Sequence, residues 1–133
     1  MSNSHQDSYS PMRQRVLFVD DEECLFEVIT NFLAEAGFEV RSTMNAIEAL
    51  EIASAFKPDV ALIGLIMPHM DGIKLGLEIT KLLPRIKVII TGEADLADLK
   101  LFRESGLPFD IFSYPFQKEE LLAKIRKWSH TDP

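Results

Sequence analysis

Two adjacent carboxylates, Asp20 and Asp21, follow a short apolar segment and are the side chains of this sequence best suited to chemistry. Neighbouring carboxylates at the end of a buried strand suit a hard cation such as Mg²⁺, which takes oxygen ligands and keeps several waters. A structural role is the alternative, because acids at the start of a helix favour the positive end of its dipole. The residues alone leave both interpretations open.

A second informative stretch, PDVALIGLIMPHMDG, runs from Pro58 to Gly72. Its apolar run, residues 60–65, contains β-branched residues without helical spacing and predicts a strand buried on both faces. The run breaks at Pro68, which cannot donate to a strand ladder. Open α/β sheets place their ligand sites at the carboxyl ends of the strands. Gly64 therefore stands where a reactive side chain would be expected.

Apolar runs alternate with helix-period segments five times along the chain. This alternation predicts right-handed βαβ crossovers, helices on both sides and a parallel sheet. The predicted fold is a flavodoxin-like, doubly wound (βα)5 domain with strand order 2-1-3-4-5. The expected strands are residues 16–20, 38–42, 60–65, 87–91 and 109–113, and the last three expected helices are 72–83, 94–105 and 117–128.

The first two expected helices have marked ends and apolar faces. Gly37 is predicted to end the first helix, because glycine is common at the position just after a helix. Asn45 is suited to cap the start of the second helix. The residues expected to point inward are Leu25, Val28, Ile29, Phe32 and Leu33 in the first helix, and Ile47, Leu50 and Ala53 in the second.

Composition narrows the class of protein. The 133 residues suit one domain, and a formal charge of −7 disfavours binding to a nucleic acid backbone. Cys24 is the single cysteine, so no internal disulfide forms, and a reducing cytoplasm is expected. No segment reaches the ~20 apolar residues of a membrane span. We expect polar tails at residues 1–14 and 130–133 around a domain at 15–129.

Four stretches, VLFVDDE, PDVALIGLIMPHMDG, VIITG and YPFQKEEL, occur in this order. Together they make the chain resemble the receiver domain of two-component response regulators, from about Arg15 to Ser129. The resemblance implies bacterial, cytoplasmic phosphorelay signalling. Expected partners are a histidine kinase or a downstream signalling protein, with no nucleic acid and no membrane.

Three working positions of the family are kept. The resemblance implies that Asp20 and Asp21 help to hold Mg²⁺, and that the Thr91 hydroxyl responds to a phosphoryl group. Three others depart from the family pattern. Gly64 stands at the position of the aspartate that accepts the phosphoryl group in the family. Tyr114 stands at the position of the family's lysine, directly before the proline that follows the fifth strand, here Pro115. The aromatic switch position falls on Ile111, although one extra residue in this region leaves Phe109 or Phe112 as alternatives.

These departures change the expected chemistry. Glycine has no nucleophile, so no acyl phosphate forms at residue 64. The Mg²⁺ site loses a third carboxylate and is weakened, while the loss of the lysine removes the compensating cation. The Tyr114 hydroxyl either reaches the site and hydrogen-bonds a carboxylate or lies on the surface of an eroded site. We also expect a cis peptide bond before Pro115.

The sequence therefore predicts an atypical receiver that is not an enzyme and acts by protein–protein contact without phosphorylation at residue 64. Its expected surface comprises the helix at 94–105, the strand at 109–113 and the last helix, including Phe102, Phe109, Phe112 and Trp128. We expect a stand-alone domain without an attached output domain, because the chain ends after the last helix. We also expect a monomer or a weak homodimer.

Two alternatives remain open. The first is a receiver phosphorylated on Asp59 or Asp71. The second is a small Mg²⁺-dependent phosphatase using Asp20 with Glu22, and a flavin-binding protein is disfavoured because these acids repel phosphate.

Overall fold

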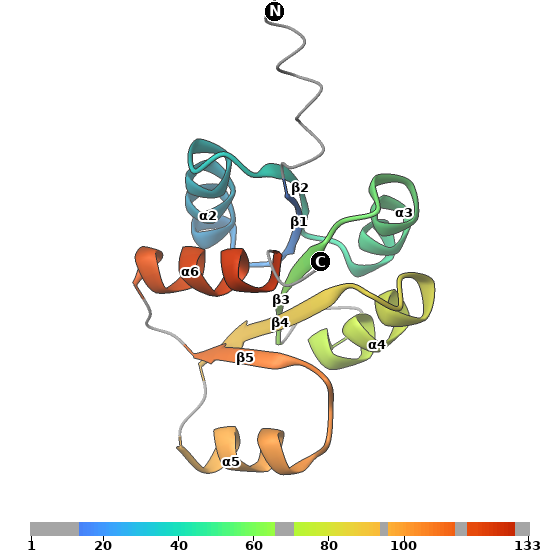
Figure 1. Ribbon diagram of the computed structural model, residues 1–133, viewed down its shortest axis with the longest axis vertical. Coiled ribbons are helices and arrows are strands. Elements are labelled where there is room, and N and C mark those ends of the chain that lie inside the picture. Colours follow the sequence, from blue (N-terminus) through green and yellow to red (C-terminus); the bar gives the residue numbers. More distant parts are fainter. Residues whose placement is uncertain (1–13, 66–70, 94–95, 114–116, 130–133) are drawn as a thin grey trace, which may run out of the picture.

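The computed structural model describes residues 14–65, 71–93, 96–113 and 117–129. Five parallel strands form one sheet in the order β2-β1-β3-β4-β5 (Figure 1). This order and the alternation with helices confirm the predicted doubly wound fold. The strands are β1 Arg15–Val19, β2 Glu39–Thr43, β3 Val60–Gly64, β4 Lys87–Gly92 and β5 Asp110–Ser113.

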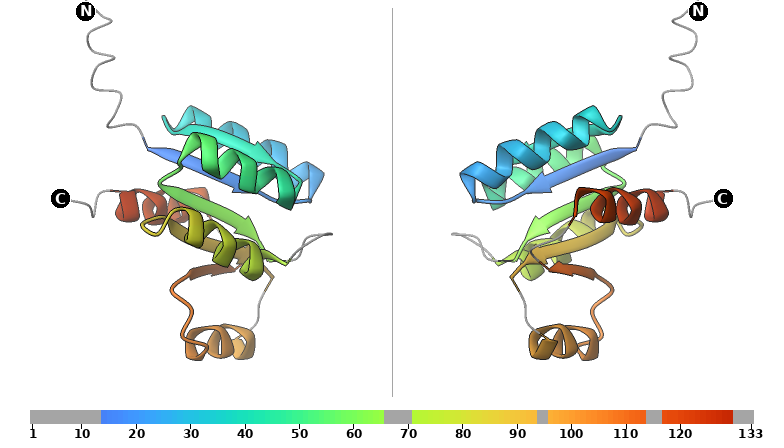
Figure 2. Two further views of the ribbon diagram at one scale, coloured as in Figure 1. Left: turned by 90° about the vertical axis from the view of Figure 1, so that its right-hand side faces the viewer. Right: turned by 90° about the vertical axis from the view of Figure 1, so that its left-hand side faces the viewer.

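Helices cover both faces of the sheet. Figure 2 shows α3 and α4 in front of the sheet in its left view, and α2 and α6 in front of it in its right view. The remaining helix, α5, lies beside the β5 edge (Figure 1). The helices are α2 Glu23–Glu35, α3 Ala46–Phe56, α4 Gly72–Leu82, α5 Leu96–Glu104 and α6 Lys118–Ser129. Within the described residues, none of them is long and apolar enough to span a bilayer.

The sheet separates two apolar cores. One core joins β1, β3 and β4 to α3 and α4 through buried residues such as Leu17, Ile63 and Leu75. The other joins the opposite face to α2 and α6 through residues such as Phe18, Leu33 and Ile125. Because alternate residues of a strand point to opposite faces, each central strand contributes to both cores. Val60–Gly64 is buried throughout, as its unbroken apolar run predicted.

The predicted helix signals at Gly37 and Asn45 are confirmed. Gly37 follows α2 with a φ of 103°, a conformation that favours glycine. The Asn45 side chain accepts a hydrogen bond from the Glu48 backbone N–H at 2.9 Å and caps α3. The cap supplies a partner for one of the first amides of the helix, which have none within it.

Two residues predicted to point inward are exposed. The buried stripe of α3 consists of Ala46, Ala49, Ala53 and Phe56. Ile47 is one residue out of this stripe, about 100° around the helix, and is 59% exposed. Val28 of α2 is 60% exposed for the same reason, since it lies next to the buried Ile29. The buried faces predicted for α2 and α3 were therefore too wide.

Close packing of α4 on the sheet depends on Gly76. A Cβ atom added at Gly76 would lie 3.0 Å from Cε2 of Phe109 and 3.1 Å from Cγ1 of Val88. Phe109 precedes β5 and belongs to the core that α4 covers. The glycine thus lets the helix lie close to the ring, and a methyl group at this position would have to displace the neighbouring side chains by a few tenths of an ångström.

We predict that Gly76→Ala destabilises the domain by about 1–3 kcal/mol, the usual cost of overpacking a core. The overpacking outweighs the gain of about 0.5–1 kcal/mol that alanine brings to a helix. Urea unfolding checks the value, and a double-mutant cycle with Phe109→Leu checks its cause. The cost of Gly76→Ala should shrink when the ring is gone, and an unchanged cost would contradict this contact.

Candidate functional site

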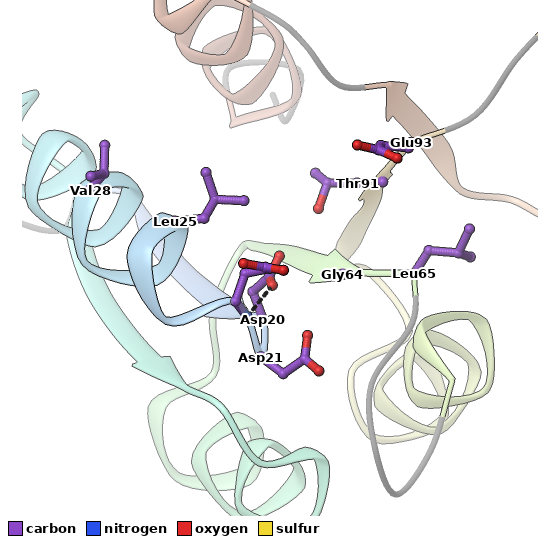
Figure 3. A pocket seen from close by; sticks show the side chains of 10 residues that line it. Asp20, Asp21, Leu25, Val28, Gly64, Leu65, Thr91 and Glu93 are labelled. Atoms are coloured by element: carbon purple, nitrogen blue, oxygen red, sulfur yellow. Dashed lines mark hydrogen bonds between the residues drawn. The ribbon is translucent and has the colours of Figure 1, made fainter.

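The carboxyl edge of the sheet brings Asp20, Gly64 and Thr91 together. Val19 of β1 pairs with Ile63 of β3, so Asp20 and Gly64, the next residue of each chain segment, are neighbours. Gly64 in turn pairs with Thr91 of β4. Figure 3 shows the Asp20 and Thr91 side chains on either side of Gly64. The predicted meeting of strand ends is confirmed for these three residues.

Asp20 lies directly against Gly64. A Cβ atom added at Gly64 would lie 3.0 Å from Oδ2 and 3.2 Å from Cγ of Asp20. Contacts of 3.0–3.2 Å are tighter than most Cβ contacts in proteins, so a side chain at residue 64 requires the Asp20 carboxylate to shift by a few tenths of an ångström. The carboxylate of Asp20 thus uses the space that a larger residue at position 64 would need.

Asp20 is a buried acid whose lost hydration is replaced only in part by hydrogen bonds. It is 5% exposed, and its Oδ1 accepts a hydrogen bond from the Glu22 backbone N–H at 2.9 Å. Burial raises the pKa of the Asp20 carboxyl above its ordinary value, the Glu22 hydrogen bond opposes this, and the Asp21 charge adds to it. Burial has this effect because the charged form loses hydration.

The sequence raised a structural alternative, in which Asp20 and Asp21 serve the start of α2. Their side chains do not occupy the cap position of this helix. The residue at the cap position is Glu22, and its side chain makes no capping hydrogen bond. Asp20 instead orders the turn before the helix through the Glu22 amide. Asp21 is exposed, and Figure 3 shows its side chain directed away from that of Asp20.

Thr91 has a buried hydroxyl whose hydrogen-bonding capacity is unused. The residue is 1% exposed, and its Oγ1 has no hydrogen-bond partner within the described part of the chain. Buried polar atoms are nearly always paired, because an unpaired one loses its hydration without replacement. Among the described residues, the hydrogen-bonding capacity of Thr91 at the site is therefore unmet.

Gly72 and Asp71 position the segment after β3. A Cβ atom at Gly72 would lie 2.1 Å from the carbonyl oxygen of Gly64, which no rearrangement of side chains relieves. The Gly72 N–H donates to the Leu65 carbonyl at 2.8 Å. Asp71 caps α4 by accepting from the Lys74 N–H at 2.7 Å. These two residues therefore have structural roles that do not involve phosphate.

Asp59 lies at the opposite, amino end of β3. Its Oδ2 accepts from the Arg15 N–H at 2.9 Å, and its own N–H donates to the Arg15 carbonyl at 2.8 Å. The contacts of Asp59 and Asp71 thus hold strand and helix ends. Neither carboxylate is among those that the fold places beside Gly64.

A pocket opens at this edge of the sheet, with a volume of about 890 Å³. Figure 3 shows acidic groups and apolar side chains around it. Its lining residues are Asp20, Asp21, Glu22, Leu25, Val28, Gly64, Leu65, Thr91, Gly92 and Glu93. The sequence prediction missed Glu93 and Val28 as members of this site. Glu93 had a usable signal, since it comes two residues after the end of a predicted strand.

Other predicted residues lie elsewhere or outside the described range. Ile111 is half-buried in β5, and Phe109 packs in the core against Gly76. Tyr114 and Pro115, with the predicted hydroxyl contact and cis peptide bond, lie outside the described residues, as do the predicted tails apart from Gln14.

Comparisons with known proteins agree on one family. The family model of the response regulator receiver domain matches residues 16–126. The chain is 34% identical over 115 residues to the DNA-binding response regulator MtrA of Mycolicibacterium paratuberculosis, covering 86% of this chain and 51% of MtrA. It is 32% identical over 111 residues to the transcriptional regulatory protein CseB of Streptomyces coelicolor, covering 84% of this chain and 47% of CseB. The chain thus spans about half the length of the curated relatives it matches.

A solved structure has the same architecture. The CheY-like response regulator receiver domain protein of Methanospirillum hungatei superposes with a TM-score of 0.78 at 27% identity, covering 88% of this chain and 94% of that one. The fold, the neighbouring strand-end residues and the family match lead to one assignment. The chain belongs to the response regulator receiver domains, the signalling domains of two-component systems.

Proposed function

We propose that this receiver domain signals through protein contacts without being phosphorylated at residue 64. The observation that carries the proposal is the packing of the Asp20 carboxylate against Gly64, where Oδ2 would lie 3.0 Å from a Cβ atom. The resemblance places the phosphoacceptor at this residue, and glycine offers no nucleophile. The domain is then a non-enzymatic binding module of the cytoplasm.

The charge of the pocket also disfavours a phosphoryl group. Four acidic residues, Asp20, Asp21, Glu22 and Glu93, line it, and the described lining residues include no lysine or arginine. A phosphoryl group brings further negative charge, and like charges at short range repel. Tyr114, at the family's lysine position, supplies no cation in return. Loss of the nucleophile and of the cation thus act in the same direction.

Mg²⁺ fits this donor set only weakly. Asp20 and Asp21 remain as carboxylate ligands, and Mg²⁺ is held in proteins by one or two carboxylates and several waters. The described residues contain no group of three or more Asp, Glu, His or Cys side chains arranged to hold a metal. When bound, the cation neutralises part of the carboxylate charge. We infer a weak site whose main effect is on stability.

The partner surface is proposed to involve α5, β5 and α6. Leu101 of α5 is 66% exposed, while Phe102 and Phe112 are half-buried. Phe109 is 8% exposed and is unavailable to a partner, contrary to one part of the sequence expectation. Trp128 lies in α6, but its side chain is outside the described part. A histidine kinase or a downstream signalling protein is the proposed partner.

The expectation of a stand-alone, monomeric or weakly dimeric protein stays a prediction. The curated relatives MtrA and CseB are named as a DNA-binding response regulator and a transcriptional regulatory protein. The phosphate-independent contact proposed for the receiver does not depend on whether such an output region accompanies it.

We predict that Mg²⁺ stabilises Gly64→Asp more than the unaltered chain. The added carboxylate displaces and repels that of Asp20 until a cation binds both. At about 10 mM Mg²⁺, a site with a Kd of about 1 mM stabilises the folded state by about 1.4 kcal/mol. Thermal unfolding with and without Mg²⁺ measures both chains, and equal shifts would show that residue 64 is remote from the cation.

We predict that Asp20→Asn stabilises the domain at pH 7. Burial raises the pKa of Asp20 in the folded state, so this carboxyl binds protons more tightly there than when unfolded. Its contribution therefore falls as pH rises from the ordinary carboxyl pKa to the raised one. Asparagine cannot ionise and retains an oxygen for the Glu22 amide.

The advantage of Asp20→Asn should shrink as pH falls from the raised pKa of Asp20 to the ordinary carboxyl pKa of about 4, and it should not change further below that pH. Urea unfolding at several pH values measures this dependence. Asp21→Asn removes one charge from the same cluster at an exposed position, and its effect should be smaller. A stability gain of Asp20→Asn that is independent of pH would exclude buried charge as its cause.

The main test of the proposed function is intact mass after incubation with acetyl phosphate and Mg²⁺. The unaltered chain should remain unmodified, because residue 64 lacks a nucleophile. Gly64→Asp alone and with Tyr114→Lys separates the contributions of the two positions, and the double variant should be labelled. A phosphoryl adduct on the unaltered chain overturns the proposal. Repeating the measurement on Asp59→Asn and on Asp71→Asn then identifies the acceptor as the residue whose replacement removes the adduct.

A further inference from the structure

The pocket beside Gly64 combines three features that the proposed function does not use. Acidic side chains line it, apolar side chains line it as well, and the buried Thr91 hydroxyl has no hydrogen-bond partner among the described residues. Each feature restricts the chemistry of what binds there. Figure 3 shows the acidic side chains and Thr91 together with Leu25 and Val28 of α2 on one side and Leu65 on the other.

The acidic rim selects a cation. Asp20, Asp21, Glu22 and Glu93 contribute carboxylates, and the lining includes no basic side chain. Asp20 is the buried member, with 5% exposure, and its Oδ1 accepts a hydrogen bond from the Glu22 amide. A buried carboxylate gains most from a positively charged donor, because solvent screens the pair least.

The apolar wall distinguishes an organic cation from a hydrated metal ion. Leu25, Val28 and Leu65 line the pocket, and Val28 is 60% exposed. Hydrated Mg²⁺ gains nothing from such a wall. An arginine side chain buries its three-carbon stem on apolar surface while its charged group reaches polar partners.

The Thr91 hydroxyl is the independent sign of a missing polar partner. Its Oγ1 is buried and unpaired within the part of the chain described, and Thr91 lines the same pocket. A hydroxyl oxygen accepts hydrogen bonds, and a guanidinium carries five N–H donors in a planar fork. One such group can therefore donate both to Thr91 and to a carboxylate.

We propose that the pocket receives an arginine side chain of a protein partner. The guanidinium is directed to Asp20 and the Thr91 hydroxyl, with its stem against Val28 and Leu25. This inference rests on the proposed function, because it makes the phosphate-free site itself a contact surface. The small Gly64 keeps the floor of the pocket open to the incoming group.

Binding of capped tripeptides to the ¹⁵N-labelled full chain tests this proposal by NMR. Acetyl-Ala-Arg-Ala-amide is the probe, and acetyl-Ala-Gln-Ala-amide is its uncharged control. The arginine peptide should shift the amide signals of Gly64, Thr91 and Gly92 with a Kd on the order of 1 mM. Addition of about 150 mM salt should weaken binding, because the rim charges are screened.

Variants assign the effect to the pocket. Glu93→Gln should weaken the arginine peptide about threefold, as expected for an exposed charge. Val28→Ser should weaken it by a similar factor of about three, because the stem loses an apolar contact. Glu51→Gln, an exposed acid in α3 outside the pocket, is the matched control and should leave the Kd unchanged.

Three results would overturn the inference. The glutamine peptide could bind as well as the arginine peptide, Glu93→Gln and Val28→Ser could both bind like the unaltered chain, or Mg²⁺ alone could shift these amides while the peptide does not. None of these outcomes involves phosphorylation. Failure here is thus distinguishable from failure of the proposed function, which appears as an acetyl phosphate adduct.

Discussion

The close approach of backbone and carboxylate around Gly64 is the constraint on which the site depends. On one side, the carbonyl of Gly64 lies so near Gly72 that a Cβ atom there would be 2.1 Å away. On the other, Asp20 occupies the space that a side chain at residue 64 would need. A larger residue at position 64 would thus press on the Asp20 side chain, which has to shift to admit it.

This arrangement leaves negative charge that nothing within the described pocket offsets. Asp20 is buried, and its pKa is raised mainly because burial removes hydration from the charged form. Glycine at residue 64 adds no carboxylate to this group of acids, and the described lining residues offer them no cation. Charge balance thus favours an external cation over an anionic phosphoryl group. The same electrostatic condition supports weak Mg²⁺ binding and arginine recognition.

The sequence predicted most of the fold because the features that indicate strands and helix ends are local in the chain. The buried run at 60–65, the cap at Asn45 and the glycine after α2 each depend on a few neighbouring residues, and all are confirmed. Ile47 and Val28 were predicted wrongly, because the width of a helix's buried face depends on how closely it packs on the sheet. Small alanines in α3 bring that helix close and leave Ile47 outside.

Part of the candidate site was predictable from the order of the strands. Parallel strand ends meet at one edge, so Asp20, Gly64 and Thr91 were expected together, whereas the turn of the Asp20 side chain toward Gly64 is a three-dimensional packing result. Asp71 and Gly72 have structural roles, so their presence is no evidence of phosphorylation. Thr91 differs, because its buried hydroxyl serves no contact within the described residues. Its hydroxyl is therefore the part of the site that most requires an outside partner.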